Sequence, residues 1–120
     1  MSRWIVEFTD EFGAWFGSLD DREQNRLVAS VQRLEAYGPQ LDYPHTSAIA
    51  GSRHSTMREL RVQIDGRPFR VFYAFNPLRA AILLIGGDKT GDGRFYEKMI
   101  PVADDLFDDH LQELRKEGLL

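Results

Sequence analysis

The first third of the 120-residue chain changes from a strand pattern to a helical pattern. Residues 4–8 (WIVEF) fit a short strand with Trp4, Val6 and Phe8 on one face. Thr9 or Asp10 then suits the cap position of a short helix that reaches about residue 16.

A second, longer helix is predicted over residues 21–37. Asp20, followed three residues later by Glu23, has the spacing of a capping box at its start. Gly38-Pro39 is a typical helix stop. The apolar stripe of this helix is formed by Leu27, Val28, Val31 and Leu34. We therefore expect the two helices to form a helical hairpin.

The middle of the chain predicts a long loop and three antiparallel strands. Residues 40–56 have no sustained period and are expected to form a loop, whereas residues 58–64 alternate as a half-buried strand does. Asp65-Gly66 predicts a two-residue hairpin turn, since both positions of a type I′ turn need positive φ. The returning strand is expected over residues 68–75. Residues 80–85 form an unbroken apolar run, typical of a strand buried on both faces, which we expect to stop at Gly86-Gly87.

The last predicted element is a helix that begins near Pro101, since proline is well placed in a first helical turn. Apolar residues recur at helical spacing after it, and its outer face is acidic. The order β-α-α-β-β-β-α predicts one α+β domain over residues 1–120. We expect an N-terminal strand and helical hairpin, then a three-stranded antiparallel meander that completes a four-stranded sheet, and a C-terminal helix.

Charge is distributed unevenly along the sequence. The formal net charge of -4 argues by itself against a nucleic-acid partner. Residues 53–98, however, carry nine Lys and Arg against five Asp and Glu, whereas the remainder carries six against fourteen. One basic surface between acidic flanks is therefore expected, and such a surface suits a polyanionic ligand.

Several kinds of chemistry are not supported by the sequence. There is no cysteine, and the three histidines lack metal-ligand spacing, so we expect no metal and no cofactor. The Gly/Asp/Lys-rich residues 86–93 match neither a phosphate-binding P-loop nor a calcium loop. No apolar run approaches 18 residues, so we expect no membrane partner and a cytoplasmic location.

Two arginines are candidates for binding an anion. If Asp65-Gly66 form the hairpin turn, Arg61 lies directly opposite Arg70. Like charges in that arrangement destabilise a sheet, and an anion between them would explain the pair. Alternatively, both side chains extend into solvent or pair with Glu59. The segment that follows the third strand of the meander would either place further polar residues beside the two arginines or form a solvated turn. These residues are Lys89, Arg94, Tyr96 and Lys98.

Three segments followed by a terminal helix resemble one protein family. They are Glu59-Leu60-Arg61, residues 69–73 (FRVFY) and residues 87–92 (GDKTGD), with Phe95-Tyr96 after them. Their order resembles RelE/HigB-type toxins of type II toxin-antitoxin systems, specifically the phage-derived Gp49-like branch. The resemblance implies a toxin that enters the ribosomal A site, cleaves mRNA and is neutralised by a cognate antitoxin protein. Contact with operator DNA is expected only through the antitoxin.

The resemblance also implies roles for individual residues in a metal-independent cleavage, in which a ribose 2′-OH attacks the adjacent phosphate. Arg61 and Arg70 would clamp the scissile phosphate. Lys89 and Arg94 would stabilise developing charge or hold the RNA backbone, and Tyr96 or Lys98 would transfer a proton. Arg53, His54 and Arg58 are expected to contact RNA.

Two other functions remain open from sequence. A ParE-like protein would use the same fold to inhibit DNA gyrase without cleaving RNA, and fold does not decide between them. An attenuated toxin would serve mainly as antitoxin partner and co-repressor. The acidic residues 104–117 suit contacts with basic antitoxin segments, or form a solvated face.

Overall fold

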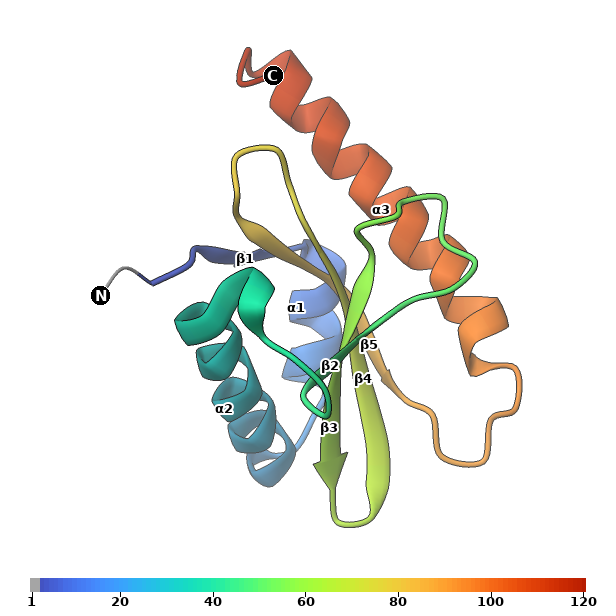
Figure 1. Cartoon of the computed structure of the whole chain (residues 1–120). Helices are drawn as coiled ribbons and strands as arrows, with labels where there is room; N and C mark the ends of the chain where they lie inside the picture. Colours follow the sequence, from blue (N-terminus) through green and yellow to red (C-terminus); the bar gives the residue numbers. More distant parts are fainter. Residues whose placement is uncertain (1–2) are drawn as a thin grey trace.

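The computed structural model describes residues 3–120 as a mixed five-stranded sheet with helices on both faces (Figure 1). None of the helices within this described range is long and apolar enough to cross a membrane. In chain order the elements are β1 (Val6–Phe8), α1 (Asp10–Gly17), α2 (Asp21–Tyr37), the short 3-10 helix η1 (Gly38–Gln40), β2 (Thr46–Ala48), β3 (Arg58–Ile64), β4 (Arg67–Phe75), β5 (Ala81–Asp88) and α3 (Phe95–Lys116).

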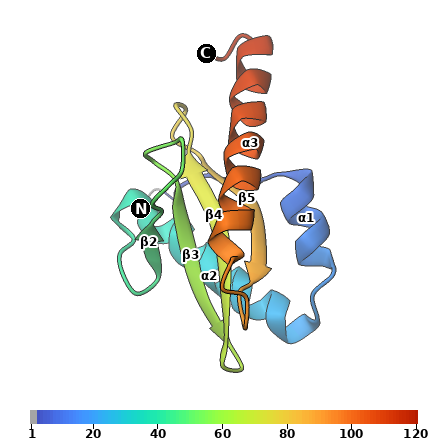
Figure 2. The ribbon, with the colours of Figure 1, turned by 90° about the vertical axis from the view of Figure 1, so that its right-hand side faces the viewer.

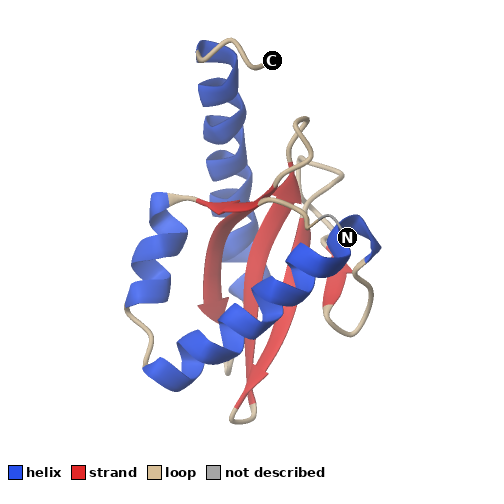
Figure 3. Ribbon diagram, turned by 90° about the vertical axis from the view of Figure 1, so that its left-hand side faces the viewer, coloured by secondary structure: helices blue, strands red, loops and turns tan. Residues whose placement is uncertain are grey.

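The strands lie side by side in the order β1-β5-β4-β3-β2. β1 pairs with β5 in parallel, and every other neighbouring pair is antiparallel. Helix α3 covers one face of the sheet (Figure 2), while α1 and α2 cover the other (Figure 3). The predicted α+β class, helical hairpin and antiparallel meander are confirmed.

Local chemistry explains where the predicted elements begin and turn. The hydroxyl of Thr9 accepts a hydrogen bond from the backbone amide of Phe12 at the start of α1. Asp20 and Glu23 form both bonds of the capping box at the start of α2. Between β3 and β4, Asp65 and Gly66 have φ values of 50° and 77°, as a type I′ turn requires.

The sheet contains one strand more than predicted. The expected loop over residues 40–56 includes β2, so the prediction of four strands was wrong. The hydroxyl of Thr46 donates to the carbonyl of Glu59 and shares a hydrogen bond with the Tyr73 hydroxyl, at 2.9 and 2.7 Å. A strand of three residues is too short to show a detectable period. The contacts that hold it are with residues distant in the sequence, so the local sequence does not indicate it.

Strand β5 continues through Gly86 and Gly87 to Asp88, so the predicted stop at the two glycines was wrong. A Cβ atom on Gly86 would lie 2.3 Å from the ring of Trp15, and one on Gly87 would lie 2.9 Å from the ring of Phe95. The glycines therefore let an aromatic ring from α1 and one from α3 pack closely on the strand.

Helix α3 begins at Phe95 rather than near Pro101, which lies inside the helix. Proline in a helix interior costs a hydrogen bond. Here the first turn is held by packing: the rings of Phe95 and Phe72 stack with centroids 5.9 Å apart, and Tyr96 packs edge-on against Phe72 at 6.1 Å. Tertiary contacts thus extended the helix beyond the expected start.

The alternation of β3 positions the polar residues of the site. Leu60, Val62 and Ile64 are buried in the core beneath α1 and α2. Since successive side chains of a strand point to opposite faces, Glu59 and Arg61 lie on the face of α3.

Candidate active site

The side chain of Glu59 lies at the centre of the polar residues on the α3 face, and only 6% of it is exposed. Its carboxylate accepts hydrogen bonds from the hydroxyl of Ser47 on β2 and from the hydroxyl of Tyr96 on α3, both at 2.7 Å. A buried carboxylate needs such partners, because burial without them is costly. Strands β2 and β3 and helix α3 therefore meet at one charged group.

Arg61 and Arg70 face each other across β3 and β4, as the sequence predicted. The Nε atom of Arg70 lies 3.4 Å from the nearer Glu59 oxygen, and an Nη atom of Arg61 lies 3.9 Å from the other oxygen. The pairing with Glu59 that the sequence left open is therefore the arrangement observed. We call Ser47, Glu59, Arg61, Arg70 and Tyr96 the Glu59 cluster.

Arg70 is buried to an unusual degree for an arginine, with 4% of the residue exposed. One terminal nitrogen donates to the carbonyl of Phe69 at 3.0 Å. Its Nε has no partner of hydrogen-bond geometry among residues 3–120. The anion that offsets this buried charge is the Glu59 carboxylate, 3.4 Å from the Nε atom.

Tyr96 is held in its protonated form. Burial raises the pKa of its phenol, the hydrogen bond to Glu59 raises it further, and Arg70 opposes both effects. The phenol therefore keeps its proton at neutral pH. The Lys89 ammonium lies 5.2 Å from the centre of the Tyr96 ring, a cation-π contact that brings this predicted residue beside the cluster.

The other two predicted catalytic residues take part in separate ion pairs. Arg94 pairs with Glu97 at 2.9 Å and is largely exposed. Lys98 lies on α3, and its ammonium lies 2.7 Å from Asp92. The structure thus gathers Arg61, Arg70 and Tyr96 around Glu59 and places Lys89 against the Tyr96 ring.

The predicted RNA-binding residues Arg53 and His54 lie against α3. Arg53 pairs with Asp105 and Asp108, whose hydrogen bonds raise its pKa, and His54 shares a 2.7 Å hydrogen bond with Asp108. The amide of Arg53 donates at 2.9 Å to Asp104, a buried carboxylate on α3. These contacts fasten the segment before β3 to the helix. Arg58 is placed differently, with its Nε donating to Thr46 at 3.3 Å.

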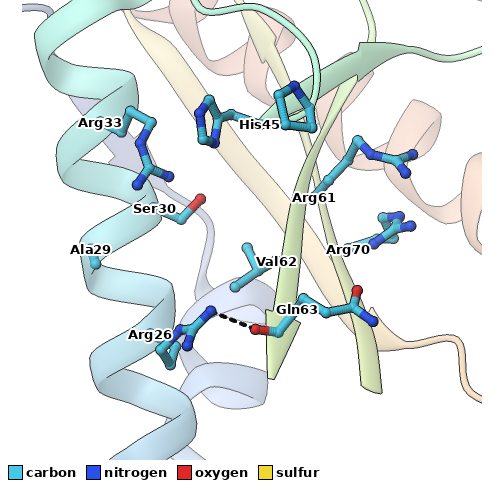
Figure 4. Close-up of a pocket in the computed structure, with 10 residues that line it drawn as sticks. Arg26, Ala29, Ser30, Arg33, His45, Arg61, Val62, Gln63 and Arg70 are labelled. Atoms are coloured by element: carbon cyan, nitrogen blue, oxygen red, sulfur yellow. Dashed lines mark hydrogen bonds between the residues drawn. The ribbon is translucent and has the colours of Figure 1, made fainter. Parts of the chain in front are cut away.

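A groove of about 430 Å³ lies between α2 and β3 (Figure 4). It follows the part of β3 that β2 leaves uncovered, since β2 pairs only with residues 58–60. Its walls include no Asp or Glu. We call it the basic groove, after the five lining residues Arg26, Arg33, His45, Arg61 and Arg70.

Sequence reasoning did not identify Glu59, Arg26 or Arg33 as functional residues. From the sequence, Glu59 is expected only as an ion-pair partner of the arginines. Arg26 and Arg33 occupy exposed positions of an amphipathic helix in an acidic part of the chain. Their separation of seven residues, two helical turns, was the available indication that they share a face.

The fold defined by these elements is that of RelE-type toxins. RelE of the *Pyrococcus horikoshii* RelE-RelB complex matches 76% of this chain and 99% of its own, with a TM-score of 0.55 and 17% identity. A double mutant of Escherichia coli toxin RelE in the free state matches 82% of this chain and 96% of its own, with a TM-score of 0.57 and 10% identity. At these identities the likeness concerns the fold.

Relatives with higher sequence identity are named as toxins of the HigB type. The putative toxin HigB2 of *Mycobacterium tuberculosis* is 37% identical over 112 residues, which are 92% of this chain and 55% of the relative. The chain thus spans about half the length of HigB2. The putative toxin HigB3 of the same organism is 38% identical over 91 residues, 75% of this chain and 78% of the relative.

The sequence pattern of the phage-derived protein Gp49-like family matches residues 14–108. The chain belongs to this family. The resemblance to the Gp49-like branch of RelE/HigB-type toxins, drawn from the sequence, is confirmed.

Proposed function

We propose that this protein is the toxin of a type II toxin-antitoxin system and acts as a ribosome-dependent mRNA endoribonuclease. One observation carries the proposal: two facing arginines, one of them buried with an unused donor, lie against a carboxylate and a protonated phenol. The relatives named as toxins support the biological role. The reaction inhibits translation by cutting the message.

The Glu59 cluster contains groups suited to each step of this reaction. Attack by a ribose 2′-OH on the adjacent phosphate needs a proton acceptor, neutralisation of the phosphate charge, and a proton donor to the departing 5′ oxygen. Arg61 and Arg70 hold the phosphate, while Lys89 and Arg94 stabilise developing charge or hold the backbone. Tyr96 donates the proton, with Lys98 the alternative for proton transfer.

The proton acceptor we assign is Glu59, a residue that the sequence did not suggest for this role. The arginines already carry their protons at neutral pH, and the raised pKa of Tyr96 keeps its phenol protonated. Replacing Glu59 by Gln preserves the side-chain shape and removes the basic oxygen. Cleavage by Glu59→Gln at the wild-type rate would contradict the assignment.

The partners in this proposal are a cognate antitoxin protein, the ribosome and its mRNA, all in the cytoplasm. The RelE neighbour from *P. horikoshii* was solved with RelB, which supports an antitoxin partner for this chain. Operator DNA is reached only through the antitoxin. Contact of Arg53, His54 and Arg58 with RNA stays a prediction, and for Arg53 and His54 it involves competition with the carboxylates of α3.

Induced expression with labelled precursors tests the target. An early fall in amino-acid incorporation, before any fall in thymidine incorporation, is expected if mRNA is cleaved. An early fall in DNA synthesis would instead support gyrase inhibition and contradict the proposal. The double variant Arg61→Ala with Arg70→Ala is the control, because it lacks both phosphate ligands and should leave both amino-acid and thymidine incorporation unaffected.

A further inference from the structure

The basic groove meets the Glu59 cluster at Arg61 and Arg70, which belong to both. Its other two arginines, Arg26 and Arg33, come from α2 and have no part in the cluster. Figure 4 shows Arg26 reaching from the helix to Gln63 on β3, and Arg33 lying along α2 near Ser30. Four arginines and a histidine line this cavity, and no carboxylate does; the guanidinium groups of Arg61 and Arg70 point away from α2, toward the Glu59 cluster (Figure 4). Such a cavity favours a polyanion.

Fold stability accounts for only part of this arrangement. Arg26 donates at 2.7 Å to the carbonyl of Gln63, which lies on the uncovered part of β3, so one of its donors protects a strand edge. Across the described residues 3–120, the ion pairs that α2 makes with the rest of the protein involve Arg22, Glu23 and Glu35. Arg33 is exposed and lines the groove from α2.

The spacing of the arginines suits a strand more than a single small anion. Arg26 and Arg33 are two helical turns apart, about 10 Å along the axis, so they would contact different phosphates. Beside the groove, Tyr43 is 68% exposed, and the centre of its ring lies 5.1 Å from the Arg61 guanidinium carbon. An exposed aromatic ring next to cationic side chains is a platform on which a base can stack.

We propose that the basic groove binds the sugar-phosphate backbone of single-stranded RNA where it continues beyond the Glu59 cluster. This inference rests on the proposed function, because it assumes that the cluster holds the scissile phosphate. Arg26 and Arg33 contact phosphates outside the reaction centre and contribute affinity without touching the reacting atoms. The groove and the cluster together give a protein of net negative charge a cationic track that passes around the β3 side of the sheet, from α2 to the α3 face.

Binding is measured with 2′-O-methyl oligonucleotides, which lack the attacking hydroxyl and cannot be cut. One probe has three nucleotides and one has twelve. The variant Arg26→Gln with Arg33→Gln is compared with Arg22→Gln with Arg115→Gln, which removes the same charge from exposed sites outside the groove. The groove variant should bind the longer probe on the order of 10-fold more weakly at 0.1 M salt. The slope of log K against log salt concentration should become shallower by about 1.4, because two phosphate contacts are lost and each contributes about 0.7 with single strands.

Two outcomes overturn the inference: equal affinity of the groove variant and the wild type for the longer probe, or equal weakening for both probe lengths. Arg33→Glu alone repeats the test without disturbing the bond from Arg26 to Gln63.

Binding to vacant ribosomes is a second experiment. Weakening there as well as with the oligonucleotide supports the groove and adds ribosomal RNA as a source of the backbone. If the groove variant binds both probes as the wild type does and loses only its binding to a co-expressed antitoxin, the inference is contradicted. Because wild-type binding and cleavage are measured separately, RNA binding without cleavage would refute the proposed function and leave the groove intact.

Discussion

At the residue scale, the pairing of Arg61 with Arg70 could be predicted and the role of Glu59 could not. The Asp65-Gly66 turn sets the register of the hairpin, so a short-range pattern was sufficient to place the arginines opposite each other. Glu59, whose carboxylate contacts both arginines, accepts a hydrogen bond from Tyr96, which lies 37 residues after Glu59 in the chain. No local rule connects positions so far apart.

Tyr96→Phe tests the proton donor at this scale. General acid-base groups contribute about 10²- to 10⁴-fold to rate, so we expect RNA cleavage to slow by about 100-fold or more. We also expect the free energy of unfolding to fall by about 1.5 to 3 kcal/mol, because a hydrogen bond to the charged Glu59 is lost. Cleavage kinetics and urea denaturation measure the two effects.

Tyr73→Phe is the matched control, since it also removes a buried phenolic hydroxyl, here bonded to Thr46 on the other face of the sheet. Its free energy of unfolding should fall by about 0.5 to 1.5 kcal/mol while cleavage is unchanged. Wild-type cleavage by Tyr96→Phe would show that this phenol is not the proton donor.

At the element scale, predictions succeeded where the controlling signals were local. The caps at Thr9 and Asp20 and the turn at Asp65 depend on neighbouring residues, and all three were correct. Strand β2 and the start of α3 depend on distant partners, such as Tyr73 for Thr46 and Phe72 for Phe95, and both were missed. Packing against the sheet decided these elements.

A contact between α3 and the turn before β5 predicts a pH dependence of stability. The side-chain amide of Asn76 lies 3.0 Å from Nε2 of His110, a bond that neutral imidazole can accept. Burial lowers the pKa of His110 below its usual value, although Glu7 and Glu117 act in the opposite direction. The folded state therefore favours the neutral ring.

Because the folded pKa of His110 is depressed, its contribution to stability is present above about pH 6.5 and is lost as pH falls through the folded pKa. We expect the free energy of unfolding, measured by urea denaturation, to decrease from pH 7 to pH 5. His110→Gln keeps an acceptor for Asn76 and cannot be protonated, so its decrease should be smaller. Equal slopes for both proteins would rule out His110 as the cause.

At the scale of the whole molecule, counting charges along the sequence identified a basic face but not its composition. Arg53 belongs to the basic segment, yet the carboxylates of α3 surround it. Arg26 and Arg33 belong to an acidic segment, yet they line the basic groove. Folding thus redistributes charge, and the surface that suits RNA could be located only after α2 was placed beside β3.

The central claim is that the face carrying Arg61, Arg70 and Tyr96 cleaves mRNA on the ribosome. Primer extension on a chosen message after induction tests it most directly. The account predicts cuts that follow the reading frame in cells expressing the wild type, and their loss in Arg61→Ala with Arg70→Ala at equal protein level. Cuts that persist in the double variant, or a wild type that inhibits growth with no cuts, would contradict the account.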